Sequence, residues 1–214
     1  MKKLLYITCN SKPEKLSASK TVGRACINAW LEADNTIQVK ELDLYEMHLP
    51  RLQHQYFKDR NSVVDKKDYD ALSEDGRKEV DRIIELSKEF RDADYYVIAT
   101  PMWNLMFPAT LKEYLDCILQ NDILMKIDPN QVTGLLNDKE RIMIYIQSSG
   151  GGIPWILEGK LNHGGTYFKD IFKFVGIKNF YEILVDKTGY TAEEQDKAIE
   201  KGKKEVKAVI EKIQ

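Results

Sequence analysis

Cysteine and histidine are scarce in this sequence, with three of each among 214 residues, and neither kind is spaced as a metal site requires. Cys9, Cys26 and Cys117 form no C-x-x-C pair, and their odd number argues against a disulfide framework. No apolar run approaches the roughly 18 residues of a membrane span, and the run at 4–8 is too short for the core of a signal peptide. We therefore expect a cytoplasmic protein with no metal and no membrane partner.

A strong bias of charge is missing as well. The 32 basic and 34 acidic residues leave a net charge of -2. This balance predicts no nucleic-acid partner, and it is not the acidic surface of an electron carrier. Hydrophobic residues make up 43% of the chain, which is enough for a packed core. The length favours a single domain over residues 1–214.

Short apolar segments alternate with amphipathic ones along the whole chain. Runs rich in β-branched and aromatic residues predict five strands, at 4–8, 37–42, 94–100, 141–146 and 177–185. Apolar positions at helical spacing predict helices between and after them, at 17–33, 69–91, 108–119, 167–174 and 191–213. The pattern indicates an α/β fold, a doubly wound parallel sheet with helices on both faces.

Capping residues mark several helix ends. Ser17 or Ser19 suits the start of the first helix, and Thr191 with Glu194 has the form of a capping box. Gly176 suits a helix end. Two segments fall outside the repeating pattern: 45–67 is expected to be an irregular surface excursion, and 123–136 a small hairpin or a loop.

Three loops that leave strand ends have unusual compositions, and ligands of open α/β sheets bind at these ends. The loop at 8–19 delivers Ser17 and Ser19 to a helix start, where backbone N–H groups and hydroxyls favour a phosphate monoester; helix capping alone is the simpler interpretation. It has neither the G-x-G-x-x-G nor the Walker A pattern.

The other two loops suit a flat ligand. The segment 101–108 carries Trp, Met and Phe between two prolines, and it offers apolar walls and the amide of Asn104, although some of these side chains belong equally well in the core. The segment 147–153 contains three glycines, whose backbone can approach a ligand closely or adopt positive φ; a flexible turn is the alternative.

Taken together, the motifs resemble those of a known family, the FMN-dependent NADH-azoreductases, which are flavodoxin-like enzymes related to the NAD(P)H quinone oxidoreductases. The resemblance covers nearly the whole chain. Its most specific part is the P-M-W-N loop followed by L-K-x-Y-L-D at 111–116, and S-x-G-G at 148–151 and F-V-G-I at 174–177 support it. It implies a flavodoxin-like five-stranded sheet with the order 2-1-3-4-5.

The resemblance also implies a set of FMN-binding residues. Around the phosphate these are Asn10, Ser17, Ala18 and Ser19. Along the ring and ribityl chain they are Pro101, Met102, Trp103, Asn104 and Leu105. At the far edge of the ring they are Ser148, Ser149, Gly150 and Gly151.

The implied activity is a ping-pong, two-electron transfer from NADH or NADPH through bound FMN to a small aromatic acceptor, a quinone or an azo compound. The flavin carries the hydride, so no side chain is expected to be catalytic. Family members are typically homodimers with the flavin near the subunit interface, and the same is expected here.

The chain departs from the family on the substrate side. Where many members have an aromatic T-F-[RK]-Y segment, it has Met125 and Ile127, and where many have Arg it has Ser149. Two other classes of protein are alternatives. A tyrosine phosphatase would place its nucleophile at Cys9, but the expected Arg is Lys15. A flavodoxin-type carrier or flavin-dependent interaction protein would bind FMN without efficient turnover.

Overall fold

The computed structural model describes residues 1–152 and 161–213. At its centre lies a sheet with the order β2-β1-β5-β8-β9, in which all neighbours are parallel. Counted along the chain, this is the expected order 2-1-3-4-5. The bounds are β1 Lys3–Thr8, β2 Gln38–Asp43, β5 Tyr95–Pro101, β8 Ile142–Ser148 and β9 Asn179–Val185.

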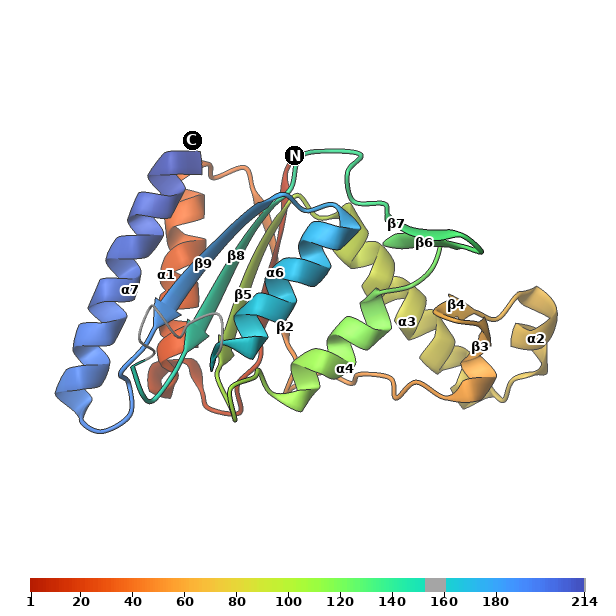
Figure 1. Ribbon diagram of the computed structural model, residues 1–214, viewed down its shortest axis with the longest axis horizontal. Coiled ribbons are helices and arrows are strands. Elements are labelled where there is room, and N and C mark those ends of the chain that lie inside the picture. The colour runs from red at the N-terminus through yellow and green to blue at the C-terminus, as the bar shows by residue number, and fades with distance from the viewer. Residues whose placement is uncertain (153–160, 214) are drawn as a thin grey trace.

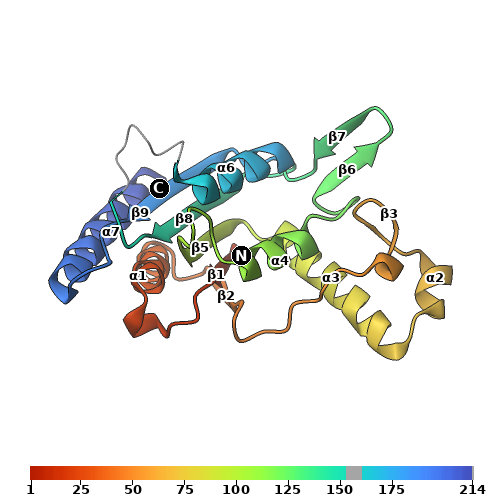
Figure 2. The ribbon, with the colours of Figure 1, turned by 60° about the horizontal axis from the view of Figure 1, so that its bottom comes forward.

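Helices cover both faces of the sheet (Figures 1 and 2). On one face lie α1 (Ala18–Ala33) and α7 (Ala192–Ile213). On the other lie α3 (Glu74–Asp92), α4 (Ala109–Ile118) and α6 (His163–Val175). Among the described residues, no helix combines the length and apolar composition that a membrane span requires.

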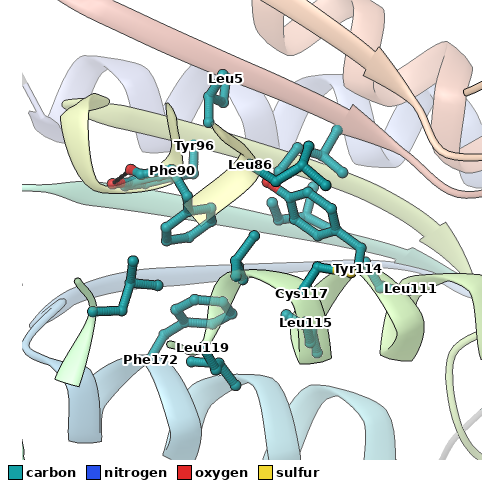
Figure 3. Close-up of a cluster of buried hydrophobic side chains, with 14 of the residues drawn as sticks. Leu5, Leu86, Phe90, Tyr96, Leu111, Tyr114, Leu115, Cys117, Leu119 and Phe172 are labelled. Carbon is teal, nitrogen blue, oxygen red and sulfur yellow. Dashed lines mark hydrogen bonds between the residues drawn. The ribbon is translucent and has the colours of Figure 1, made fainter. Parts of the chain in front are cut away.

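Alternation along the strands divides the core into two layers. In β1, Leu4 and Tyr6 belong to the cluster under α1 and α7, whereas Leu5 and Ile7 belong to the cluster under α3, α4 and α6. Both sets are buried, because each face of a parallel sheet is covered by helices. Most of the buried aromatic rings lie in the cluster under α3, α4 and α6, where Phe90 stacks on Tyr96 and Phe172 with ring centroids 4.4 and 5.2 Å apart (Figure 3).

The helix expected at 69–91 is in fact two helices, so that prediction was wrong in its boundaries. Helix α2 (Lys66–Ala71) ends at Leu72, and α3 starts anew with Ser73 as its N-cap. The Ser73 hydroxyl accepts the backbone N–H of Gly76 at 3.1 Å. Such a cap competes with continuation of the preceding helix, because Ser73 adopts extended backbone angles there.

The excursion at 45–67 is more regular than expected. It contains the 3-10 turn η2 (His54–Tyr56) and a small hairpin of β3 (Phe57–Asp59) and β4 (Ser62–Val63). Side chains tie this hairpin to the segment after α4: the Asn61 amide donates to the carbonyl of Leu119 at 2.8 Å.

The segment 123–136, for which the sequence allowed either a hairpin or a loop, forms a hairpin. Strands β6 (Met125–Asp128) and β7 (Gln131–Gly134) pair antiparallel, and in both ribbon views the hairpin projects from the end of the molecule that carries β3, β4 and α2 (Figures 1 and 2). Gly134 lies so close to the carboxyl end of α6 that a Cβ there would come within 2.4 Å of the Phe174 carbonyl oxygen.

Helix ends agree with the expected caps. Gly176 ends α6 in the left-handed conformation with φ of 119°. The Thr191 hydroxyl accepts the N–H of Glu194, and the Glu194 carboxylate accepts the N–H of Thr191, both at 3.1 Å, which is a capping box. Helix α6 begins at His163, four residues before the expected start, because Asn162 caps it by accepting the N–H of Gly165 at 2.9 Å.

Candidate functional site

A cavity of about 260 Å³ opens at the carboxyl ends of the strands, the lower edge of the sheet in Figure 1 and opposite both chain termini. Its walls come from the loops after β1, β5 and β8, from the start of α1, and from the segment that joins β9 to α7. The lining residues are Asn10, Ser11, Lys12, Leu16, Ser17, Ala18, Pro101, Met102, Trp103, Ser148, Gly150, Thr188, Gly189 and Gln195.

Ser17 caps α1 at the floor of this cavity. Its hydroxyl accepts the backbone N–H of Lys20 at 3.3 Å and the side-chain amide of Asn10 at 2.9 Å, and it lies 3.2 Å from the Ser19 hydroxyl. The first N–H groups of a helix have no partner inside it. Here those of Ala18 and Ser19 form no hydrogen bond within the described part of the chain. No acidic residue lies in the first turn of α1, so this end of the helix suits an anion.

The loop after β5 contains a tight turn. Trp103 and Met106 exchange backbone hydrogen bonds of 2.6 and 3.0 Å, and the two residues between them, Asn104 and Leu105, have φ of 51° and 64°. Positive φ at both central positions is the signature of a type I′ turn, which Asn favours and Leu rarely adopts. The turn holds Trp103 and Leu105 partly in solvent, with exposed fractions of 45% and 41%.

The glycine loop after β8 is fixed by its neighbours. The Met102 N–H donates to the Ser148 carbonyl at 2.6 Å, which joins this loop to the one after β5. The Ser149 hydroxyl donates to the Gly151 carbonyl at 2.7 Å. Thr188 donates to the Ser149 carbonyl from both its N–H, at 3.1 Å, and its hydroxyl, at 3.0 Å.

Glycine serves close approach in this loop, and not positive φ. Gly150 packs against Gly189, where a Cβ would come within 2.7 Å of the Gly150 carbonyl oxygen. Gly151 faces open space. Among the described residues, Gly176 is the glycine with positive φ, so of the two alternatives for this glycine run positive φ does not apply.

The structure brings the three predicted loops together, and eight of the thirteen predicted residues line the cavity: Asn10, Ser17, Ala18, Pro101, Met102, Trp103, Ser148 and Gly150. The other five lie next to it without lining it. Ser19 is fully buried behind Ser17, Asn104 and Leu105 form the turn beyond Trp103, and Ser149 and Gly151 flank Gly150. Gly152, at the end of the glycine run, is the last described residue before 153–160; Ile153 of the expected loop lies outside the described residues.

Sequence reasoning missed one wall of the cavity. Thr188 and Gly189 belong to the loop after β9, and Gln195 lies in the first turns of α7. A usable signal was present, because this loop leaves the last parallel strand at the same edge of the sheet as the other three. Ser11, Lys12 and Leu16 were missed within the first loop.

The environment of Cys9 does not fit the alternative that the protein is a tyrosine phosphatase. Cys9 is fully buried, does not line the cavity, and burial raises the pKa of its thiol to about 12. A thiol with so high a pKa is not a nucleophile at neutral pH. The Cys9 side chain belongs to the core cluster under α4.

Two further cavities are weaker candidates for the functional site. The larger, of about 600 Å³, lies at the amino-terminal ends of β1 and β2 and far from the three loops. The other, of about 310 Å³, shares Asn10, Ser11 and Lys12 with the candidate site. Much of its charged wall is already paired, Lys20 with Asp43 and Arg24 with Glu41. We therefore assign the function to the cavity where the loops converge.

Comparison with known proteins agrees with this architecture. Residues 2–210 match the family model described as having a flavodoxin-like fold. The FMN-dependent NADH:quinone oxidoreductase of Ruminiclostridium cellulolyticum is 48% identical to this chain over 213 residues, and the alignment covers 100% of both chains. A protein of Bacillus subtilis, FMN-dependent NADH:quinone oxidoreductase 2, is 34% identical over 198 residues, with 92% of each chain covered.

A solved structure has the same fold. It is the FMN-dependent NADH-azoreductase of Bacillus anthracis in complex with FMN, which superposes with a TM-score of 0.84 at 23% identity and covers 100% of this chain and 99% of its own. The match along the whole chain and the high identity to curated relatives show the family. The chain has a flavodoxin-like fold and belongs to the family of the FMN-dependent NADH:quinone oxidoreductases.

Proposed function

We propose that this protein is an oxidoreductase that binds FMN without a covalent bond and uses NADH to reduce small aromatic acceptors, quinones or azo compounds, by two electrons. The observation that supports this proposal most strongly is that the loops after β1, β5 and β8 converge on one cavity at the start of α1. The curated relatives with 48% and 34% identity bear names that state this activity. Residues 1–214 act in it as one domain.

The α1 end of the cavity fits the phosphate of FMN. Free N–H groups of Ala18 and Ser19, the Ser17 hydroxyl and the ammonium group of Lys12 provide donors and positive charge. The cavity is smaller than the roughly 300–1000 Å³ of typical pockets for drug-sized ligands. The ring of FMN would therefore extend beyond it, toward the exposed Trp103 and the glycine loop.

The ring end fits a flat apolar group. Met102 and Trp103 provide soft and aromatic surfaces, and the turn at 103–106 keeps them at the edge of the cavity. Ser148 and Gly150 bring backbone groups of the glycine loop to the cavity next to them. We propose that Pro101–Leu105 and Ser148–Gly151 hold the ring in this way, with Asn10 and Ser17–Ser19 at the phosphate.

Bound FMN supplies the two-electron chemistry, and the chain binds and orients it. The Cys9 thiol near the cavity is buried and its pKa is raised, so it is not suited to act as a nucleophile there. The exposed Trp103 and Leu105 leave an apolar surface at the mouth, on which a nicotinamide and then an acceptor would bind in turn.

We also propose that the protein is a cytoplasmic homodimer. The β6–β7 hairpin projects from the domain and leaves Val132 42% exposed, and Phe174 on the neighbouring α6 is 47% exposed. An isolated hairpin is marginally stable, so a second subunit against this surface would stabilise it. The three free and buried cysteines suit a reducing compartment.

Steady-state kinetics test the function and separate it from an electron carrier. Initial rates of NADH oxidation are measured at several fixed menadione concentrations, with FMN-loaded protein. We expect parallel lines in double-reciprocal plots, which indicate a ping-pong mechanism. Negligible turnover by protein that retains FMN would favour the carrier. Parallel assays with NADPH and with an azo dye define the donor and the acceptor class.

A further inference from the structure

A fourth segment, Asp186–Tyr190 between β9 and α7, lies against the glycine loop and was not among the expected site residues. Four interactions join the two loops. Three are the hydrogen bonds to carbonyls, two from Thr188 to Ser149 and one from the Lys187 N–H to Gly151 at 3.3 Å. The fourth is the packing of Gly189 on Gly150.

The peptide between Ser149 and Gly150 is held in one orientation by these contacts. Its carbonyl oxygen accepts two hydrogen bonds from Thr188. In a trans peptide the N–H points opposite to the carbonyl, so the Gly150 N–H is directed away from Thr188. Gly150 lines the cavity, and its N–H forms no hydrogen bond within the described residues. The orientation of one backbone donor at the site therefore depends on Thr188.

We propose that Thr188 is a positioning residue of the cofactor site, which acts through the Ser149 carbonyl to aim the Gly150 N–H at the bound flavin. This inference rests on the proposed FMN site. A donor directed at the flavin ring stabilises the negative charge that reduction places there, so the contact affects both the affinity for FMN and the ease of its reduction.

Gly189 is required for the same arrangement. A Cβ at this position would come within 2.7 Å of the Gly150 carbonyl oxygen and 2.9 Å of its Cα. Both atoms belong to the backbone, so the two loops must move apart to accommodate a side chain. Gly189→Ala is therefore expected to disturb the glycine loop without removing any hydrogen-bonding group.

The test compares matched variants of the full chain. Thr188→Val removes the hydroxyl and keeps the shape of the side chain, and Thr188→Ser restores the hydroxyl. Tyr190→Phe is the control, because it also removes one hydroxyl from this segment, but from a side chain that is 85% exposed and does not line the cavity. The Kd for FMN is measured by quenching of flavin fluorescence, and the midpoint potential of the bound flavin is measured separately.

One hydrogen bond to a carbonyl contributes about 1 kcal/mol, so Thr188→Val is expected to raise the Kd for FMN about fivefold and to make the midpoint potential more negative. Thr188→Ser should match the wild type, as should Tyr190→Phe, and Gly189→Ala should weaken FMN binding further. A change in the melting temperature of the apoprotein with unchanged Kd and potential for Thr188→Val would overturn the proposal. Wild-type protein that does not bind FMN would instead contradict the proposed function itself.

Discussion

The backbone N–H of Met102 donates to the Ser148 carbonyl at 2.6 Å, so the loops after β5 and β8 are joined directly at the cavity. Ser148 belongs to the last pair of the β5–β8 register, with Pro101, and Met102 is the next residue beyond it. The two loops therefore extend the sheet beyond its regular end. A ligand that contacts one loop is affected by the geometry of the other.

The turn at Asn104 gives the first prediction. Its φ of 51° suits Asn or Gly and costs an Ala residue about 1 kcal/mol. We expect Asn104→Ala to lower the free energy of unfolding of the apoprotein by about that amount, and Asn104→Gly to stay near the wild type. Urea denaturation of the apoproteins measures this difference. Equal stability of the two variants would show that the turn places no such demand on the backbone.

Substitutions of Ser17 can distinguish its role as a helix cap from its proposed role in phosphate binding. Asp caps a helix as well as Ser does, but its charge repels a phosphate. Ser17→Asp should therefore leave the stability of the apoprotein near that of the wild type and raise the Kd for FMN on the order of a hundredfold. Ser17→Ala should lower the stability by about 1 kcal/mol. Tight FMN binding by Ser17→Asp would place the phosphate elsewhere.

The cysteines give a prediction about pH. Burial raises the pKa of the Cys9, Cys26 and Cys117 thiols to about 12, whereas the ordinary value is 9.0. The folded state thus favours the protonated thiols, so stability is full below pH 9 and falls as the pH rises toward 12. At pH 8 a disulfide reagent should modify none of the three thiols in native protein and all three in urea. Rapid labelling of native Cys9 would contradict its burial.

Replacing all three cysteines by Ala provides the control for the pH profile. Other groups also titrate in the alkaline range, and their contribution remains in this variant. The fall in the free energy of unfolding between pH 9 and 12 should be shallower without the thiols. An identical slope would mean that the thiols do not contribute.

The proposed subunit interface can be tested at the β6–β7 hairpin. Val132→Lys and Phe174→Lys place charges on the apolar surface that we assign to the dimer, and both should shift the protein toward monomer in sedimentation velocity. Gln131→Lys is a suitable control on the same strand, because this side chain is already polar and exposed. A dimer that survives both changes would use another surface.

Much of the fold was predictable because its signals are local. The strands of the sheet are runs of β-branched and aromatic residues, and caps such as Thr191 act within one helical turn. The break between α2 and α3 was missed because apolar residues keep a helical spacing on both sides of Leu72. The side-chain cap at Ser73, with its extended backbone, is what separates the two helices.

The three loops were picked out by their composition and their place after strands, and the residues within them by the resemblance to the family. The cavity residues that were missed depend on non-local contacts. Nothing near Thr188 in the sequence indicates that its hydroxyl meets the Ser149 carbonyl, 39 residues away. Likewise, the Asn104–Leu105 dipeptide does not predict a turn with positive φ at both residues, because Leu rarely adopts positive φ. Such contacts depend on the assembled sheet.

The most direct test of the account is a titration of the apoprotein with FMN, followed by flavin fluorescence. We expect saturation at one FMN per chain and a protein that stays yellow after gel filtration, because the loops after β1, β5 and β8 form one site. A protein that remains colourless and leaves the fluorescence of added FMN unchanged would contradict it.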